Sequence, residues 1–322
     1  MRAVRIAEPG GPDVLETEHV PRPEPGPGEV LLQIEAAGVN FIDVYQRTGL
    51  YAVDPPFTPG MEAAGTVAAV ADGVSDWALG DRAAYAMVRG SYADYATVAA
   101  DRLVAVPDDV ALSTAAAVTL QGLTAQYLAT GTYPIREGDT ALVHAGAGGV
   151  GLLLTQVIAS IGGRVISTVS NQEKAALARE AGADEVILYT EQDVVAEVRR
   201  HTGGRGAEVV YDSVGKDTFD DSLDSLAPRG MLVLFGQSSG HVAPLDIQRL
   251  NSGGSLYVTR PSLAHYTADP QELRARAAQV LGWVSSGDLS VRIHTTMRLD
   301  EAATAHRMLE GRETAGKVLL IP

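Results

Sequence analysis

Residues 143–151 read Val-His-Ala-Gly-Ala-Gly-Gly-Val-Gly, and the spacing of these glycines is typical of a loop that binds the diphosphate of a dinucleotide. In the pattern G-x-G-x-x-G the first glycine makes a tight turn, the second lets the backbone approach the diphosphate, and the third lets a helix pack closely on a strand. The free N–H groups and the positive dipole end of that helix then face the anion. We therefore predict a diphosphate site formed by Gly146, Gly148, Gly149, Val150 and Gly151.

A second position bears on which dinucleotide could bind. Proteins that use NAD commonly carry an acidic residue about 20 positions further on, which binds the ribose 2′-hydroxyl and would repel a 2′-phosphate. Here Ser170 stands 19 positions after Gly151, and Lys174 follows it. A hydroxyl with a nearby ammonium suits a 2′-phosphate, so the sequence favours NADPH over NADH. Alternatively, Ser170 caps the helix that begins near Gln172 and Lys174 is a solvated helix residue; the two interpretations do not exclude each other.

The 322 residues include no cysteine. Disulfides, thiolate nucleophiles and zinc sites with sulfur ligands are therefore excluded. The seven histidines are scattered and form neither H-x-x-x-H nor H-E-x-x-H. We accordingly predict no metal site.

The net charge of −15 disfavours nucleic acid as a partner, because phosphate binding relies on a broad basic surface. The local basic pair Arg199-Arg200 is predicted to lie on a solvated helix face. The apolar stretches are too short to span a bilayer, and the first residues lack the long apolar segment of a signal peptide. We expect a cytoplasmic protein with no membrane partner.

The elements that must position these residues fall into two groups, as expected for a chain of 322 residues with 46% hydrophobic residues. Residues 1 to about 123 contain short β-like runs at 29–36, 62–71 and 93–99, separated by proline and glycine clusters. These runs predict a compact, mostly antiparallel β domain. The proline-rich segment 21–27 is predicted to be a loop that leads into the strand at Glu29.

From about residue 125 the pattern alternates between strands and helices. Strands are predicted at 140–144, 164–169, 185–188, 208–211, 231–235 and 256–259, with helices at 150–160, 172–181, 194–201 and 218–226. This alternation predicts a doubly wound parallel α/β sheet with strand order 3-2-1-4-5-6. After residue 264 come helices at 270–285 and 300–310 and a strand at 316–322, which fit poorly as a further βα unit. We predict domains of 1–124 and 125–264, with 265–322 returning to the first domain.

Several further motifs accompany the glycine run in a fixed order. They are residues 38–51 (Gly-Val-Asn-Phe-Ile-Asp-Val-Tyr-Gln-Arg-Thr-Gly-Leu-Tyr), 59–65, 120–127, 234–240 and 258–263. Taken together over essentially the whole length, the chain resembles the medium-chain dehydrogenase/reductase superfamily, specifically its zinc-free quinone oxidoreductase branch. The resemblance implies a Rossmann domain inserted into a discontinuous, β-rich GroES-like catalytic domain.

Zinc-dependent relatives place a cysteine and a histidine where this chain has Asn40 and Met61. An amide and a thioether cannot replace a thiolate and an imidazole at a Zn²⁺ Lewis-acid site. Alcohol oxidation through a metal alkoxide is therefore not expected.

The resemblance implies the remaining cofactor contacts. The adenosine phosphate would be contacted by Lys174 and Tyr189, and the nicotinamide ribose by Asn40 and Thr124. The nicotinamide ring would lie against Phe235, Gly236, Ser238 and Leu263, with Ser213 at the end of a neighbouring strand. Alternatively, Asn40 is a turn residue after Gly38 and Phe235 is a core residue at a strand end.

Tyr45 and Tyr51 lie in the segment expected to border the substrate cleft. A phenol can donate a hydrogen bond to a quinone oxygen, so both are predicted to orient the substrate rather than to act as essential acids, since quinols take protons from water. The alternative is that they only line the cleft. Asp43, beside them, is expected to be structural.

The function expected is hydride transfer from NADPH to a quinone or a related α,β-unsaturated carbonyl, without metal or flavin. Two alternatives remain open, an enoyl or alkenal double-bond reductase and a nucleotide-binding protein without enzymatic activity. Residues 254–259 would form an apolar edge strand, which favours pairing with a second copy into a homodimer.

Overall fold

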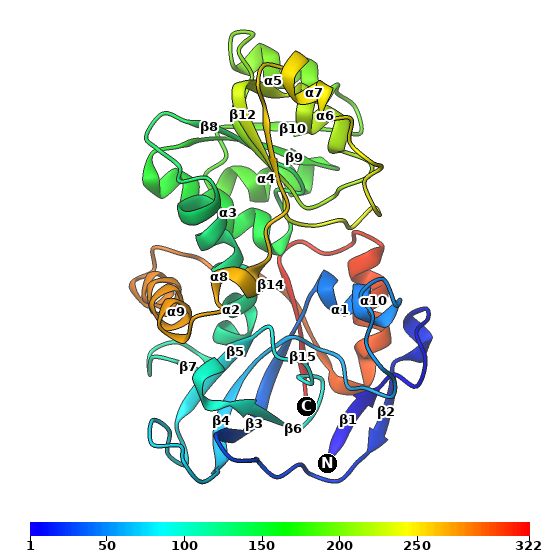
Figure 1. The fold of residues 1–322 in the computed structure, drawn as a ribbon, viewed down its shortest axis with the longest axis vertical. Coiled ribbons are helices and arrows are strands. Elements are labelled where there is room, and N and C mark those ends of the chain that lie inside the picture. The colour runs from blue at the N-terminus through cyan, green and yellow to red at the C-terminus, as the bar shows by residue number, and fades with distance from the viewer. The chain divides into compact units, whose positions relative to one another are not determined.

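The computed structural model describes residues 1–322, which divide into two compact units (Figure 1). The first unit comprises residues 1–123 and 266–322, and the second comprises residues 124–265. The glycine run of residues 143–151 therefore lies wholly within the second unit.

The second unit is built on a six-stranded sheet in which every pair of neighbouring strands is parallel. Its strands are β8 (Thr140–Val143), β9 (Arg164–Val169), β10 (Glu185–Leu188), β11 (Ala207–Asp212), β12 (Leu226–Leu234) and β13 (Tyr257–Thr259). They lie in the order β10-β9-β8-β11-β12-β13, so the predicted order 3-2-1-4-5-6 is confirmed. The carboxyl ends of all these strands share one edge, which is where open α/β sheets bind ligands.

Helices connect these strands. They are α3 (Gly149–Ile161), α4 (Gln172–Glu180), α5 (Val194–His201), α6 (Phe219–Asp224) and α7 (Gln248–Ser252), with α8 (Leu263–Tyr266) at the end of the unit. The helix α6 is shorter than the predicted 218–226, because Leu226 already pairs with Ala207 in the sheet. The helix α3 ends at Gly162, whose φ of 91° is the left-handed conformation that glycine adopts without strain.

The start of α4 differs from one of the sequence-based interpretations. Its N-cap is Asn171, whose side-chain oxygen accepts the backbone N–H of Lys174 at 2.9 Å. Ser170 therefore does not cap this helix. Asn171 has an extended backbone at the position that an N-cap requires, and asparagine caps helices as well as serine does.

The first unit contains a seven-stranded sheet and a separate β hairpin-like pair of strands. Its strands are β1 (Arg2–Arg5), β2 (Glu16–His19), β3 (Glu29–Val39), β4 (Glu62–Val70), β5 (Arg82–Ala86), β6 (Tyr95–Ala99), β7 (Val104–Ala105), β14 (Ile293–Arg298) and β15 (Lys317–Ile321). All pairs are antiparallel except β14 with β15. Since β15 pairs with β3 and sets Val318 opposite Val39, the last strand brings Lys317 beside the residues that follow Gly38.

The helices of this unit are α1 (Phe41–Arg47), α2 (Leu112–Tyr127), α9 (Pro270–Ser286) and α10 (Ala302–Glu310), with short 3-10 turns η1 (Pro12–Val14), η2 (Ala100–Arg102) and η4 (Leu299–Glu301). The sequence pattern did not indicate α1 and α2. The helix α2 continues into a π-helical turn, Leu128–Thr132, at the start of the second unit. Because α2 consists mainly of small and apolar residues, it lacks the alternation of polar and apolar faces that identifies a surface helix.

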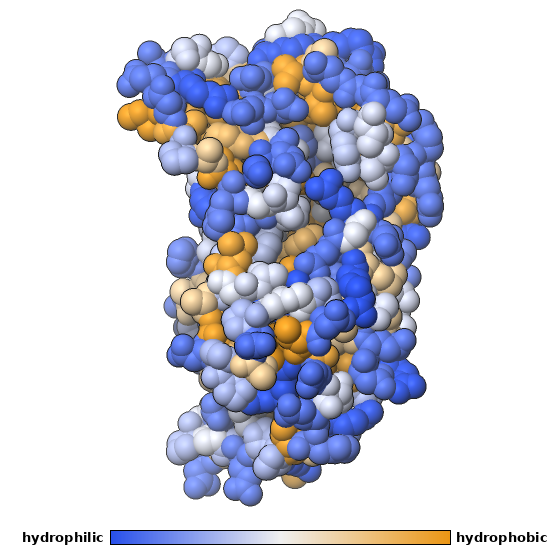
Figure 2. All heavy atoms as spheres, turned by 90° about the vertical axis from the view of Figure 1, so that its right-hand side faces the viewer, coloured by the Kyte–Doolittle hydropathy of each residue, from blue (hydrophilic) through white to orange (hydrophobic).

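The face drawn in Figure 2 is mostly hydrophilic, and its hydrophobic atoms form small separate patches. This surface accords with 40 acidic residues against 25 basic ones. None of the helices has the length and apolar character needed to cross a membrane.

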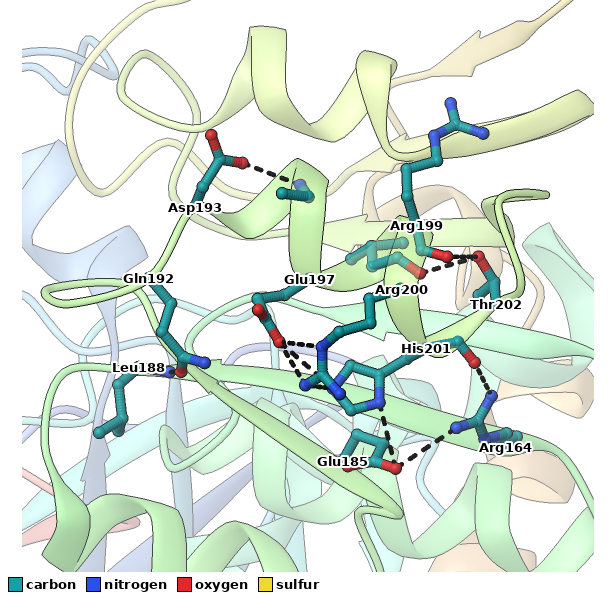
Figure 3. Close-up of polar contacts among 12 residues, drawn as sticks. Arg164, Glu185, Leu188, Gln192, Asp193, Glu197, Arg199, Arg200, His201 and Thr202 are labelled. Atoms are coloured by element: carbon teal, nitrogen blue, oxygen red, sulfur yellow. Dashed lines mark hydrogen bonds and ion pairs between the residues drawn. The ribbon is translucent and has the colours of Figure 1, made fainter.

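Charged side chains join α5 to the amino ends of β9 and β10 (Figure 3). Arg200 is exposed and pairs with Glu197 at 2.5 Å, as predicted for a solvated face. Arg199 differs, because it extends to the other side of the helix and donates to four backbone carbonyls, those of Gly204, Arg205, Asp224 and Leu226, at 2.7 to 3.2 Å. Arg199 is partly exposed, so the predicted solvated face holds only in part for this residue, which also ties two loops to α5.

Replacing Arg199 by methionine should lower the free energy of unfolding by about 1–3 kcal/mol, because carbonyl groups lose their donor. Arg200→Met is the matched control and should leave that free energy almost unchanged, because its ion pair is exposed to solvent. Urea unfolding of both variants measures the difference. Equal losses in the two variants would contradict this role for Arg199.

Candidate functional site

The glycine run forms a tight loop between β8 and α3. A Cβ added to Gly146 would lie 1.5 Å from the Oγ of Ser167, and one on Gly151 would lie 2.4 Å from the carbonyl oxygen of Ala145. Neither position tolerates a side chain, because loop, strand and helix are in direct contact there. A Cβ on Gly148 would meet only that same carbonyl oxygen, at 3.1 Å, and is otherwise unobstructed. The backbone at Gly148 can therefore be approached by a ligand.

The amino end of α3 can accept an anion. Its N-cap is Gly148, so no side chain caps the first turn of the helix. Gly148, Gly149 and Val150 are partly exposed, and the N–H groups of a first turn have no partner within the helix. This arrangement fits a diphosphate group.

A second group of predicted residues meets at the carboxyl ends of β9 and β10. Val169 and Leu188 are paired in the parallel ladder, so the residues that follow them, Ser170 and Tyr189, lie side by side. The chain is held there by hydrogen bonds from the Tyr189 N–H to the Val169 carbonyl (3.2 Å) and from the Thr190 hydroxyl to the Ser170 carbonyl (3.1 Å). Since Asn171 caps α4, the Ser170 hydroxyl is not used in capping. Lys174 follows in the first turn of α4.

A third group lies where β11 and β12 end. The Ser213 carbonyl accepts the N–H of Ser238 at 3.1 Å, and a Cβ on Gly236 would lie 2.5 Å from that same carbonyl oxygen. The Phe235 N–H donates to the Asp212 carbonyl at 2.8 Å. Ser213, Phe235, Gly236 and Ser238 are therefore brought together, whereas the other two predicted residues of this unit, Thr124 and Leu263, are buried elsewhere in the chain, before β8 and after β13.

In the first unit, Asn40 forms part of a buried polar cluster. Its Oδ1 accepts from the Nζ of Lys317 at 2.8 Å and from the Nε2 of Gln121 at 3.3 Å. Its Nδ2 donates to Glu62 Oε2 at 3.0 Å and to the Gly38 carbonyl at 3.2 Å. The carboxamide of Asn40 thus uses both donors and both acceptor positions, so a ribose hydroxyl could bind it only by replacing a present partner.

Lys317 and Glu62 form an ion pair with exposed fractions of 1% and 0%. The other carboxylate oxygen of Glu62 accepts the backbone N–H of Leu120 at 2.5 Å. A Cβ on Gly38 would lie 2.2 Å from Glu62 Oε2, so only glycine fits beside this pair. Sequence reasoning missed both charged residues, although each is a charged residue at the start of an otherwise apolar strand.

A second buried network starts at Asp43 in α1. Its carboxylate accepts the Asn40 N–H at 2.8 Å and the Tyr92 hydroxyl at 3.0 Å, and burial raises the pKa of Asp43 to about 7. The Tyr92 hydroxyl also contacts His306 Nε2 at 3.1 Å, and burial lowers the pKa of His306 to about 3. Asp43 thereby links Asn40 to the interior of the unit.

Tyr45 and Tyr51 lie together. Their ring centroids are 5.2 Å apart in an edge-on arrangement, and the Tyr51 N–H donates to the Tyr45 carbonyl at 2.9 Å. Tyr45 is buried, with 8% of its surface exposed, whereas 37% of Tyr51 is exposed. Tyr51 is thus the more accessible of the two phenols.

Met61, the residue expected to stand where zinc-dependent relatives have a histidine, is buried. Its sulfur contacts the Nε2 of Gln46 at 3.3 Å. A zinc ion here would have to be bound by Asn40 and Met61. The Asn40 amide is hydrogen-bonded to the ion pair of Lys317 and Glu62, and the Met61 thioether contacts the amide of Gln46. These side chains do not fit a Zn²⁺ site.

Comparison with known proteins agrees with this geometry. Residues 26–108 match the family described as "Alcohol dehydrogenase GroES-like domain", and residues 149–279 match "Zinc-binding dehydrogenase". The quinone oxidoreductase of Pseudomonas aeruginosa is 46% identical over 323 residues, covering 100% of this chain and 99% of that protein. The chain belongs to the quinone oxidoreductase branch of the medium-chain dehydrogenase/reductase superfamily.

Other members of the superfamily extend the comparison. A 2-haloacrylate reductase from a Burkholderia species is 40% identical, covering 99% of this chain and 98% of that protein. The Escherichia coli quinone oxidoreductase complexed with NADPH has a TM-score of 0.98 at 40% identity, and a mycobacterial protein complexed with NADPH has a TM-score of 0.98 at 49% identity. Each of these two matches covers 100% of this chain and 100% of the chain it is compared with.

The buried ion pair of this family member can be tested by removing one charge or both. Lys317→Met should lower the free energy of unfolding by about 3–5 kcal/mol, because the Glu62 carboxylate is left unpaired in the interior. The double variant Glu62→Gln, Lys317→Met should lose less than this single variant, because no buried charge remains. Urea unfolding measures both. Glu62→Gln alone completes the set, and a double variant that loses as much as the sum of the two single variants would show that the two charges act independently.

Proposed function

We propose that this protein reduces a quinone, or a related enone, with NADPH as the hydride donor and without a metal ion. When bound, NADPH supplies the hydride from C4 of its nicotinamide. The observation that carries the choice of cofactor is the carboxyl end of β9, where Ser170 stands in place of a carboxylate, beside Tyr189 and before Lys174. Support for the reaction comes from relatives named quinone oxidoreductases at 42–46% identity over nearly the whole chain.

Each group of residues has its own task in this proposal. The diphosphate would be bound by the backbone of Gly146, Gly148, Gly149, Val150 and Gly151. The 2′-phosphate would be bound by Ser170, Lys174 and Tyr189, and the nicotinamide half by Asn40, Thr124, Ser213, Phe235, Gly236, Ser238 and Leu263. Residues 1–124 and 265–322 would supply the substrate side. Rate enhancement would come from holding donor and acceptor in a fixed orientation and from excluding water.

Tyr45 and Tyr51 are proposed to orient the acceptor by donating hydrogen bonds to its oxygen. Neither needs to act as an essential acid, because a quinol takes its protons from water.

A second candidate function is reduction of a carbon–carbon double bond. It is favoured by the relative named 2-haloacrylate reductase, since a haloacrylate is an α,β-unsaturated acid and this relative covers 99% of the chain. The cofactor half of the site would serve both reactions equally, so the difference lies in the acceptor.

The acceptor is tested by NADPH oxidation with a quinone, an enone, a haloacrylate and an enoyl thioester at equal concentrations. We expect the highest kcat/KM with the quinone. A higher value with the haloacrylate or the thioester would establish the second candidate. Binding of NADPH without its oxidation by any acceptor would contradict both reactions and favour a non-enzymatic protein.

The choice of cofactor is tested by Ser170→Asp. A carboxylate at this position should repel the 2′-phosphate and lower kcat/KM for NADPH relative to NADH by at least about tenfold. Ser75→Asp, which adds the same charge at an exposed position of the first unit, should leave the ratio unchanged. Comparable kcat/KM values for the two cofactors in the wild-type protein would refute the proposed preference.

The tyrosines are tested by Tyr45→Phe, Tyr51→Phe and the double variant. Loss of a hydrogen bond to the acceptor should reduce kcat/KM for the quinone by about three- to tenfold in each single variant, with the Kd for NADPH unchanged. Full activity of the double variant would show that both residues only line the cleft.

We also propose a homodimer. The strand β13 is at the end of the sheet order, so one of its edges has no partner strand, and 57% of its first residue, Tyr257, is exposed. An unprotected edge can pair with a second copy across a twofold axis. Light scattering at micromolar concentration should give twice the chain mass of 33.7 kDa, and the monomer mass would contradict pairing. A cytoplasmic location stays a prediction.

A further inference from the structure

A chain of buried hydrogen bonds crosses the carboxyl ends of three neighbouring strands of the second unit. Thr168 near the end of β9 contacts His144 after β8 (Oγ1 to Nδ1, 3.0 Å), and His144 contacts Ser222 of α6 (Nε2 to Oγ, 3.1 Å). Ser222 in turn donates to Asp212 at the end of β11 (Oγ to Oδ2, 2.8 Å). The exposed fraction of each of these residues is 3% or less. Sequence reasoning assigned none of them to the site.

The direction of each hydrogen bond follows from the carboxylate. Asp212 Oδ1 accepts the N–H groups of Val214 and Gly215 at 2.7 and 3.0 Å, and Oδ2 accepts the hydroxyls of Thr218 and Ser222, each at 2.8 Å. A carboxylate only accepts, so the single hydroxyl proton of Ser222 points to Asp212. Ser222 must then accept the proton of His144.

It follows that His144 carries its proton on Nε2, and that its bare Nδ1 accepts the hydroxyl proton of Thr168. Burial lowers the pKa of His144, which keeps the ring neutral as this pattern requires. Every polar atom of the imidazole is used, and no other side chain can supply a donor and an acceptor at the two ends of a rigid ring in the same way.

Each end of this chain leads directly to a predicted cofactor contact. Thr168 stands two residues before Ser170, and its carbonyl accepts the N–H of Gly146 at 3.0 Å. His144 itself immediately precedes the glycine loop.

At the other end, the Asp212 carboxylate holds the two N–H groups that follow Ser213, and its carbonyl accepts the N–H of Phe235 at 2.8 Å. The hydrogen-bond chain therefore joins the segments proposed to bind the diphosphate and the 2′-phosphate to the segments proposed to bind the nicotinamide.

We propose that His144 is a positioning residue that couples the phosphate side of the cofactor site to its nicotinamide side. This inference rests on the proposed function, because it takes NADPH to span these strand ends. A ligand that reaches both sides benefits from loops that are already ordered relative to each other, since it need not supply that ordering itself. A ligand that reaches only the phosphate side contacts the glycine loop and the end of β9, and these two segments stay joined by the backbone hydrogen bond from Gly146 to Thr168 without the His144 side chain.

The test compares NADPH with 2′,5′-ADP, which contains the phosphate side without the nicotinamide, in equilibrium binding measured by calorimetry. His144→Gln keeps a donor for Ser222 but not the acceptor for Thr168, and His144→Leu removes both. We expect His144→Leu to raise the Kd for NADPH by about tenfold or more while the Kd for 2′,5′-ADP changes less than about threefold. Ser222→Ala should act in the same way, and the double variant His144→Leu, Ser222→Ala should be no weaker than His144→Leu alone, because both changes break one connection.

Tyr211→Phe is the matched control. It removes a buried hydrogen bond of the same unit, from the Tyr211 hydroxyl to the Leu128 carbonyl at 3.2 Å, and should leave both Kd values unchanged. If His144→Leu does not fold, His144→Gln is measured instead. It should also raise the Kd for NADPH more than the Kd for 2′,5′-ADP.

Two results would overturn the coupling. In a folded variant, an unchanged Kd for NADPH would make His144 a purely structural residue, and equal losses for NADPH and 2′,5′-ADP would confine its role to the phosphate side. Because the comparison is between bound ligands and needs no acceptor, it is independent of quinone turnover. Wild-type protein that binds NADPH but does not reduce quinones would contradict the proposed function and leave the coupling to be decided by the binding data.

Discussion

The second unit depends on the close contact between the glycine loop and its two neighbours, β9 and α3. With Ser167 against Gly146 and the Ala145 carbonyl against Gly151, any Cβ at either glycine would separate loop from strand or helix from loop. This contact sets α3 so that its uncapped first turn lies at the carboxyl edge of the sheet, next to the ends of β9 and β11. An uncapped helix end is a cost to an isolated protein, and binding an anion there satisfies the N–H groups that the fold leaves without partners.

In the first unit, a buried ion pair and its hydrogen bonds hold Asn40, one of the two residues expected to stand where zinc-dependent relatives carry metal ligands. Two charges in the interior lose their hydration, and this loss is offset only when every remaining donor and acceptor has a partner. Glu62 meets this condition through Lys317, Asn40 and the Leu120 N–H. The same pair fixes the orientation of the Asn40 carboxamide. An amide at this position and the thioether of Met61 do not provide the thiolate and imidazole that a Zn²⁺ site needs.

Local patterns allowed much of the second unit to be predicted, because the strand order and the glycine loop follow from alternation and spacing within short segments. Contacts between distant segments could not be predicted in this way. Lys317 and Glu62 are 255 residues apart, and they meet because β3 pairs with β15 on one side and with β4 on the other. The helix α2 was missed because its small apolar residues carry no period. The interpretation of Ser170 as the N-cap of α4 was wrong by one residue, because Asn171 follows it and both residue types cap helices. The residues predicted to bind the cofactor lie in three groups that follow β8, β9 with β10, and β11 with β12, and their roles stay predictions. The network around His144 could not be predicted, because it depends on hydroxyl and carboxylate partners that no motif reveals.

The central claim is that NADPH delivers a hydride to the acceptor in a site that needs no metal. It is tested most directly by the oxidation of NADPH deuterated at C4, with a quinone as acceptor and a strong metal chelator present. The account predicts an undiminished rate with the chelator and a primary isotope effect on the oxidation step, because the C4–H bond is broken directly. Loss of activity on chelation, restored by adding back a divalent metal, would contradict it.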